Sequence, residues 1–256
     1  MSSQAAGLIL TYHSIADGSS PLRISPSLFA QQMEWLKTNS HVAPLTEIVD
    51  SLANHRPLPP RSVALTFDDG FLDFHSHAAP ILSRLGFSAT VFLPTAFCGA
   101  TNRWPGQPSW VEEQPLMTWQ HISELAQQGF MFGAHTVNHP DLTQISESAV
   151  QQEILSAKQD IERHTGRAVD FFCYPYGRWN SRVHALVSEH YRAACSTRTA
   201  MLSRNADLWA LPRVDAHLVR QPAVFRSLFD RFFPAYLSAR RTVRRFRGLP
   251  ESVYGN

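Results

Sequence analysis

Two pairs of polar residues have types and a spacing that could carry out hydrolysis. Asp68 and Asp69 are adjacent in the string VALTFDDGF, and His135 and His139 stand four positions apart in GAHTVNHPDL. One carboxylate and two imidazoles can hold a single divalent ion and leave positions open for water and substrate. The second carboxylate can then take a proton from that water. Zinc is the first choice for such a donor set, which cobalt, nickel and iron also accept.

Each pair alone also has an ordinary structural explanation. Adjacent acidic residues after a strand often form a turn or cap a helix, and Gly70 favours a turn here. Two histidines at this spacing can lie on one side of a helix or turn without binding a metal. The metal hydrolase interpretation therefore depends on whether the chain brings both pairs together.

The elements that must position these residues alternate in type along the chain. Short β-branched or aromatic runs are separated by longer segments of helical period, which is typical of an α/β fold with a mainly parallel sheet. A chain of 256 residues, 44% of them hydrophobic, is large enough for one domain with a substantial core. The predicted strands are residues 8–12, 63–67, 89–93, 130–134, 170–174 and 192–196.

Capping residues bracket three of the intervening segments, which favours helices there. The stretch 101–116, rich in Pro and Trp, is predicted to be a surface loop instead. The predicted helices are residues 26–37 after Ser25, residues 119–128 between Thr118 and Gly129, and residues 147–165 between Ser146 and Gly166.

The candidate residues all follow predicted strands. Asp68 and Asp69 directly follow one strand, His135 follows another, and Tyr176 comes shortly after a third. In a parallel α/β barrel the carboxyl ends of all strands open onto the same face. We therefore expect these residues, which are far apart in the sequence, to converge there.

Longer segments around these residues resemble the polysaccharide deacetylases of carbohydrate esterase family 4, which share the NodB homology domain. TFDDGF with Asp73, AAPIL and GFSATVFL resemble the first block of that family, MTWQHISELAQQGFMFGAHTVNHPDLT resembles the second, and FFCYPYG resembles the third. With LPRV near its end, the likeness covers roughly residues 8–215. It implies a distorted (β/α) barrel of about seven strands as a single domain, residues 1–219. The composition of residues 220–256 separately predicts a basic, Arg-rich helical segment.

The resemblance also implies a role for individual residues. Asp68 would be the general base. Thr136 matches a Ser or Thr that steadies a ligand imidazole through a hydrogen bond. Tyr176 matches a tyrosine whose backbone N–H helps to hold the tetrahedral oxyanion. The implied ligands of the divalent ion are Asp69, His135 and His139.

The residue that gives a proton to the leaving amine is not found at the family's usual position. In most members it is a His in a late Leu-x-x-His block, which has no clear counterpart here. A circularly permuted subset carries this His on the N-terminal strand, and LTYHSI resembles that subset. His13 is therefore the predicted general acid, with His217 as the alternative. An imidazole pKa near about 6.5 would allow His13 to donate at neutral pH.

The residue that orients the catalytic carboxylate also differs from the family's common pattern. The family's third block commonly begins with an Arg, and here Phe172 or Cys173 stands near that place. A guanidinium can hold a carboxylate through two parallel hydrogen bonds. Arg213 in LPRV is the predicted partner of Asp68, and Arg178 is the second choice.

The implied activity is removal of the N-acetyl group from an N-acetylhexosamine unit by a metal-dependent hydrolase. O-deacetylases and non-sugar amide hydrolases of the same fold are alternatives, because fold alone does not fix the substrate. Two other classes stay open: a catalytically silent sugar-binding module, and a glycosidase that uses Asp68 with a second carboxylate.

The two ends of the sequence carry predictions about location and partners. MSSQAAGLILTYHSI has no basic n-region and only a short apolar run, which predicts a cytoplasmic protein. Residues 220–247 contain eight Arg, no Lys and one Asp among Phe, Leu and Tyr. This composition is compatible with peripheral contact to an anionic membrane and with a lipid-linked N-acetylated sugar, or with a solvated helix packed on the domain. No nucleic-acid motif accompanies the charge.

Overall fold

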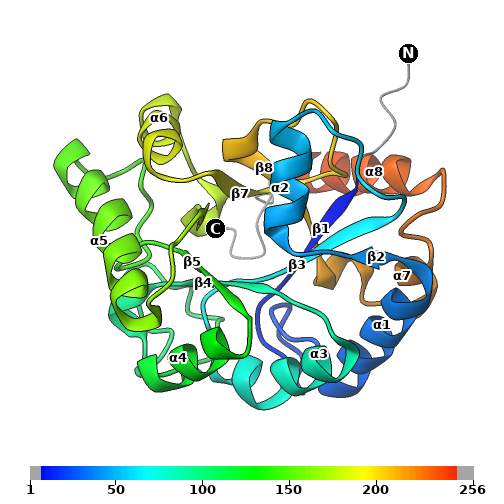
Figure 1. Ribbon diagram of the computed structural model, residues 1–256, viewed down its shortest axis with the longest axis horizontal. Helices are drawn as coiled ribbons and strands as arrows, with labels where there is room; N and C mark the ends of the chain where they lie inside the picture. Colours follow the sequence, from blue (N-terminus) through cyan, green and yellow to red (C-terminus); the bar gives the residue numbers. More distant parts are fainter. Residues whose placement is uncertain (1–6, 247–256) are drawn as a thin grey trace.

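A computed structural model of the protein describes residues 7–246 and shows a closed barrel of parallel strands (Figure 1). The strand order is β1-β8-β7-β6-β5-β4-β3, and β3 closes the ring by pairing with β1 in the register Leu8↔Val63 to Tyr12↔Phe67. The short β2 pairs with β3 beside this ring. The predicted barrel of about seven strands in a single domain is confirmed. The strands are β1 (Leu8–Tyr12), β2 (His41–Val42), β3 (Ser62–Phe67), β4 (Thr90–Leu93), β5 (Met131–Ala134), β6 (Phe171–Cys173), β7 (Ala193–Thr199) and β8 (Leu211–Asp215).

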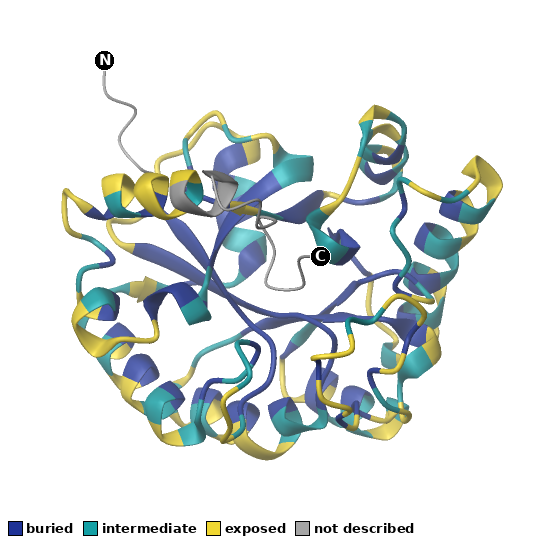
Figure 2. Ribbon diagram, turned by 180° about the vertical axis from the view of Figure 1, so that it is seen from behind, coloured by how far each residue is buried: buried dark blue, intermediate teal, exposed yellow. Residues whose placement is uncertain are grey.

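Helices surround the strands and leave them buried in the middle of the molecule (Figure 2). Shorter helical turns occur at Phe74–Ala78, Thr95–Phe97, Pro175–Gly177, Leu208–Ala210 and Ala216–Val219. The α-helices are α1 (Pro26–Asn39), α2 (Leu45–Ala53), α3 (Ala79–Leu85), α4 (Trp119–Gln127), α5 (Glu147–Thr165), α6 (Ser181–His190), α7 (Pro222–Arg226) and α8 (Phe233–Phe246).

Alternate residues of β1 belong to different hydrophobic clusters, because successive side chains of a strand point to opposite faces. Leu8, Leu10 and Tyr12 pack with helix residues such as Phe29 of α1 in the larger cluster. Ile9 joins the second cluster, which gathers residues of six barrel strands together with apolar residues of α2. The outer face of β1 thus holds a helix, and its inner face fills the barrel.

All six predicted strands are present; both ends of β1 are as predicted, and the ends of the others differ by at most three residues. The prediction missed β2, which has only two residues, and β8. Pro212 and Arg213 interrupt the apolar pattern of β8, and Pro cannot donate to a sheet ladder. β8 is nevertheless paired on both sides, through Leu10↔Val214 with β1 and Cys195↔Leu211 with β7.

Three predicted helices begin at their predicted capping residues. The Ser25 hydroxyl accepts a hydrogen bond from the N–H of Leu28, Thr118 forms a capping box with His121, and Ser146 caps α5. Gly166 ends α5 with φ at 65°, a left-handed conformation that a side chain would strain.

The basic segment after residue 219 is helical in its described part, where α7 and α8 lie. Phe225, Leu228, Phe233 and Leu237 are buried and belong to the same core as the barrel helices. Residues 247–256 of the predicted segment lie outside the described residues, and a boundary at residue 219 stays a prediction. Within residues 7–246, none of the helices has the length and apolar character needed to cross a membrane.

Candidate metal centre and active site

The loops that leave the carboxyl ends of β3, β5 and β6 hold several residues of the candidate site in unusual backbone conformations. Six non-glycine residues of the described chain have positive φ, and four of them are at this site. Such conformations cost free energy and persist where the surrounding structure enforces them, often at functional sites. The four are Asp69 (71°), Thr136 (70°), His139 (55°) and Tyr176 (58°).

Asp69, His135 and His139 bring three potential ligand atoms together. Oδ1 of Asp69 lies 3.5 Å from Nε2 of His135 and 3.6 Å from Nε2 of His139, and the two Nε2 atoms are 3.1 Å apart. Ligand atoms about 2.0–2.2 Å from a single ion lie roughly 3–3.5 Å from one another. The three side chains, all buried, therefore fit one divalent ion.

A hydrogen bond of the second ring nitrogen of His135, Nδ1, supports the fit to a divalent ion. Nδ1 of His135 lies 2.7 Å from the carbonyl oxygen of Cys173. A carbonyl oxygen only accepts, so Nδ1 carries the proton and the lone pair of Nε2 faces the three-residue cluster. Burial lowers the pKa of both His135 and His139, which keeps the imidazoles neutral as metal ligation requires.

A second set of residues, Asp68, His135 and Cys173, also meets the spacing for a metal. It fits an ion less well, because both carboxylate oxygens of Asp68 accept hydrogen bonds from Arg213. Burial also raises the pKa of the Cys173 thiol well above its usual value, and a protonated thiol is a poor ligand. The Asp69 set is therefore the better fit for a divalent ion.

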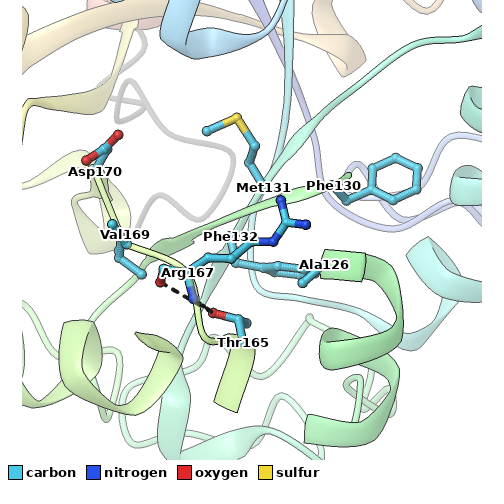
Figure 3. Close-up of a pocket in the computed structure, with 9 residues that line it drawn as sticks. Ala126, Phe130, Met131, Phe132, Thr165, Arg167, Val169 and Asp170 are labelled. Carbon is cyan, nitrogen blue, oxygen red and sulfur yellow. Dashed lines mark hydrogen bonds between the residues drawn. The ribbon is translucent and has the colours of Figure 1, made fainter. Parts of the chain in front are cut away.

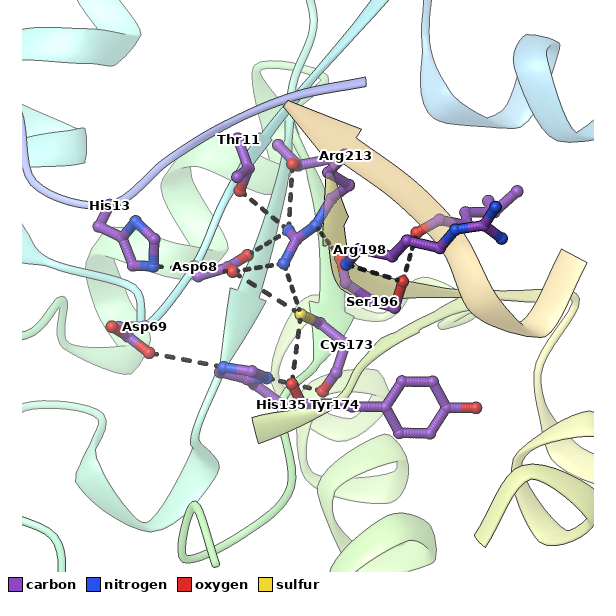
Figure 4. A network of polar contacts seen from close by, with 12 residues as sticks. Thr11, His13, Asp68, Asp69, His135, Cys173, Tyr174, Ser196, Arg198 and Arg213 are labelled. Atoms are coloured by element: carbon purple, nitrogen blue, oxygen red, sulfur yellow. Dashed lines mark hydrogen bonds and ion pairs between the residues drawn. The ribbon is translucent and has the colours of Figure 1, made fainter. Parts of the chain in front are cut away.

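Asp68 and Arg213 form a buried bidentate ion pair (Figure 4). Nη1 and Nη2 of Arg213 donate to the two carboxylate oxygens of Asp68, each at 2.7 Å. Arg213 also donates to the Thr11 hydroxyl at 2.9 Å and to the Ser196 carbonyl at 3.0 Å. This arrangement fixes the orientation of the Asp68 carboxylate.

The charge of Arg213 controls the protonation of Asp68. Burial acts to raise the pKa of Asp68, but the guanidinium charge and its hydrogen bonds outweigh burial and hold that pKa well below its ordinary value. Asp68 is therefore ionised at neutral pH and available to accept a proton. Arg178, the second choice for this partner, instead pairs with Asp141 at 2.8 Å.

His13 lies beside Asp68, with Nε2 3.9 Å from Oδ2 of the carboxylate. Burial lowers the pKa of His13 to about 4, although Asp68 acts in the opposite direction. The sequence-based expectation of a pKa near about 6.5 is therefore wrong for the resting site, because it neglected burial. His217, the alternative acid, lies in the turn Ala216–Val219 after β8. Its backbone N–H donates to the Asp215 carboxylate at 2.8 Å.

The Thr136 hydroxyl and the Tyr176 ring both contact His139. The Thr136 hydroxyl accepts a hydrogen bond from the backbone N–H of His139 at 2.9 Å, so it holds the backbone of this residue. The Tyr176 ring packs edge-on against the His139 ring, with centroids 4.7 Å apart. The His139 imidazole is thereby confined between Tyr176 and Trp104, whose ring lies 4.3 Å away.

Sequence reasoning missed several residues that support the site. Trp104 lies in the predicted surface loop 101–116 but is only 3% exposed, because its ring packs on His139. The Cys173 thiol accepts from Nη2 of Arg213 at 3.2 Å and lies 3.7 Å from Oδ2 of Asp68. The position of Cys173 in the third block, where an Arg is usual, was the available signal.

Hydrogen bonds to the Asp73 carboxylate fix the position of the segment that carries His13. Its carboxylate accepts hydrogen bonds from the backbone N–H of Ile15 at 2.9 Å and from the Ser14 hydroxyl at 2.5 Å. The Ser14 hydroxyl oxygen also lies 3.1 Å from Oε1 of Gln114. These bonds join the segment after β1 to the loop after β3, and so place His13 near Asp68.

We expect Asp73→Ala to lower kcat by up to about 100-fold, because releasing Ser14 and Ile15 would misplace His13. The metal content should be unchanged, since Asp73 does not touch the three ligands. Asp50→Ala, which removes a surface carboxylate paired with Arg192, serves as the control. Wild-type turnover in the Asp73 variant would show that this residue does not position the site.

A pocket of about 350 Å³ lies at the other end of the barrel (Figure 3). Phe130, Met131 and Asp170 line it, and they stand at the amino ends of β5 and β6. The candidate site lies at the carboxyl ends of the strands, where barrel enzymes bind their substrates. We therefore do not assign the substrate to this pocket.

A parallel barrel that groups two imidazoles and two carboxylates at the carboxyl ends of its strands has the kinds of side chain that a metal hydrolase uses. The sequence model described as polysaccharide deacetylase matches residues 55–193, more than half of the chain. The chain belongs to the polysaccharide deacetylase family, as its resemblance to the NodB homology domain predicted.

Curated relatives carry related names. YxkH of Bacillus subtilis, whose name places it among the polysaccharide deacetylases, is 29% identical over 209 residues, covering 80% of this chain and 70% of that protein. Poly-β-1,6-N-acetyl-D-glucosamine N-deacetylase of Staphylococcus epidermidis is 22% identical over 215 residues, covering 78% of this chain and 71% of that protein. The Escherichia coli (strain K12) protein of the same name is 26% identical over 143 residues, which cover 50% of this chain and 20% of that protein.

Solved structures share the fold. The Streptococcus pyogenes deacetylase PplD in complex with acetate superposes with a TM-score of 0.72 at 28% identity, covering 81% of this chain and 91% of that chain. IcaB from Ammonifex degensii superposes with a TM-score of 0.74 at 23% identity, covering 88% of this chain and 96% of that chain. At that identity, the likeness to IcaB supports the fold alone.

Proposed function

We propose that the protein is a metal-dependent deacetylase that hydrolyses the N-acetyl group of an N-acetylhexosamine unit in a glycan. The observation that carries this proposal is the ion site of Asp69, His135 and His139 beside the ionised carboxylate of Asp68. The names of the Staphylococcus and Escherichia relatives support the choice of an N-acetylated sugar. Zinc is our first choice of ion, with cobalt, nickel or iron as alternatives.

A divalent ion held by these three residues would act as a Lewis acid and lower the pKa of water from about 15.7 to about 7. Asp68 takes the proton from the attacking water, and Arg213 holds the carboxylate in the orientation for this transfer. The backbone N–H of Tyr176 stabilises negative charge on the acyl oxygen. Such a donor typically contributes about 2.7–4 kcal/mol.

His13 delivers a proton to the departing amine. With a pKa of about 4, His13 is neutral in the resting site and must first receive that proton. Asp68, 3.9 Å away, is the group that holds a proton after the water has attacked. The two side chains thus form a relay from the nucleophile to the leaving group, as a circularly permuted member would place its acid.

Products distinguish this function from its alternatives. Incubation with β-1,6-linked N-acetylglucosamine oligomers should release acetate and create free amines without new reducing ends. New reducing ends without acetate would indicate a glycosidase, and binding without either product would indicate a sugar-binding module. Acetate from O-acetylated but not N-acetylated sugars would indicate an O-deacetylase.

The cytoplasmic location and a lipid-linked substrate at the inner membrane surface remain part of the proposal. The arginines of the C-terminal segment support contact with anionic lipid, because Arg226, Arg231 and Arg240 are exposed. The apolar residues of this segment are already buried in the protein core. Lipid contact would therefore be mainly electrostatic and sensitive to salt.

Replacing Arg226, Arg231 and Arg240 with Gln should weaken sedimentation with phosphatidylglycerol vesicles by about 100-fold, given about 1 kcal/mol per basic residue near such a surface. Substitution, unlike truncation before Arg220, leaves the buried part of the segment in place. Equal sedimentation of wild type and variant would rule out this surface. The control replaces three exposed arginines elsewhere with Gln: Arg163, Arg167 and Arg198.

A further inference from the structure

The pocket of about 350 Å³ at the amino ends of β5 and β6 has no role in the proposed function (Figure 3). Three segments form its walls: the last turn of α4, the start of β5, and the end of α5 with the loop that leads to β6. Its volume is at the lower end of the range of small-molecule sites, which is about 300–1,000 Å³. The apolar residues that line it are Ala126, Phe130, Met131, Phe132, Ala168 and Val169.

The floor of the pocket is apolar and fixed in the protein core. Phe130, Phe132 and Val169 are buried and belong to the cluster that packs the helices onto the barrel. The short side chains of Ala126 and Ala168 leave room above this floor. Water gains few hydrogen bonds on such a surface, so an apolar group that displaces it binds favourably.

One cation faces this apolar surface. Figure 3 shows the Arg167 side chain extending over Phe132 toward Met131. Arg167 forms hydrogen bonds with Thr165 through its backbone alone, at 3.3 and 3.5 Å. Within residues 7–246 its guanidinium makes no ion pair or hydrogen bond. A planar guanidinium can bind a carboxylate through two parallel hydrogen bonds, so this group is available to an anionic ligand.

The acidic side chain of the pocket is already compensated. The Asp170 carboxylate accepts a hydrogen bond from Nη1 of Arg192 at 3.1 Å. In Figure 3 this carboxylate points away from the Arg167 guanidinium. The charge that a ligand meets above the apolar floor is therefore positive, which favours an anion over a neutral molecule or a cation.

We propose that this pocket is a second ligand site, which binds an amphipathic carboxylate. The aliphatic chain of the ligand lies on the apolar floor, and its carboxylate pairs with Arg167. A fully polar anion would leave the apolar floor in contact with water, so the pocket selects a ligand that has both parts. The pocket and the metal centre are at opposite ends of the barrel, so the two sites can be occupied together. This inference goes beyond the proposed function and does not depend on it.

Calorimetric titration with sodium octanoate tests this site, and sodium butyrate and 1-octanol separate the contributions of chain and charge. The wild type should bind octanoate at least about tenfold more tightly than butyrate, because butyrate has four methylene groups fewer to bury. Arg167→Gln should weaken octanoate binding about tenfold and leave 1-octanol binding unchanged. Arg163→Gln is the matched control, since Arg163 is an exposed arginine of α5 that does not line the pocket.

Two further variants show where octanoate binds. Ala168→Trp should fill the pocket and abolish octanoate binding without disturbing the core, because Ala168 is exposed. Asp69→Ala should bind octanoate like the wild type, because the ligand does not use the metal centre. Equal octanoate affinity in the wild type, Arg167→Gln and Ala168→Trp overturns the inference, as does loss of binding in Asp69→Ala. Neither result bears on whether the protein is a deacetylase.

Discussion

Asp68→Asn is expected to lower kcat for acetate release by about 10²–10⁴-fold, the usual contribution of a positioned general base. The amide cannot accept the proton of the attacking water, although it keeps nearly the same shape. The metal content should remain that of the wild type, because Asp68 is held by Arg213 and is not assigned to the ion. Single-turnover acetate release and elemental analysis measure the two effects separately.

Asp141→Asn provides the control for this substitution, since Asp141 is a carboxylate that pairs with Arg178, accepts hydrogen bonds from Thr143 and is not assigned to the ion. We expect nearly normal turnover in that variant. If Asp68→Asn retains more than a tenth of the wild-type kcat, Asp68 is not the base. Loss of the metal together with activity would instead make Asp68 a ligand.

Arg213→Met is expected to destabilise the fold by about 3–5 kcal/mol, because it leaves the Asp68 carboxylate buried without its partner. The pKa of Asp68 should rise, since burial then acts without the opposing guanidinium. A base loses activity as pH falls through its pKa, so the acid limb of the pH–rate profile should move to higher pH. Denaturant unfolding and kcat/KM against pH are the measurements.

Two variants separate this effect from a general loss of positive charge. Arg178→Met removes a half-exposed ion pair and should cost less than about 1 kcal/mol, with no shift of the acid limb. Arg213→Lys keeps the charge but not the two parallel hydrogen bonds, so it should recover stability only in part. An unchanged pH profile in Arg213→Met would exclude its role in orienting Asp68.

The fold was largely predictable because most strands carry a regular signal. The β-branched and aromatic runs identified β1 and β3 to β7, and capping residues such as Ser25 marked the helices. The sequence did not predict β8, because Arg213 faces the barrel interior, where the side chains of a strand are normally apolar. A guanidinium that points inward and is stabilised by a carboxylate from the loop after β3 cannot be recognised before the neighbouring elements are known.

The grouping of the candidate site residues was predictable from the sequence, but their electrostatics were not. Sequence position placed Asp69, His135 and His139 on one face, and the structure brings them together. The choice between Arg213 and Arg178 required three-dimensional contacts, as did the low pKa that burial imposes on His13. Local sequence contains no information on how deeply such a side chain is buried.

The central claim is tested most directly by elemental analysis of the dialysed protein and its variants. The wild type should hold one divalent ion per chain, and Asp68→Asn should hold the same amount. The variants Asp69→Ala, His135→Ala and His139→Ala should each lose the ion while remaining folded by circular dichroism. One full equivalent of ion in all three ligand variants would contradict the assignment of these residues as the metal centre.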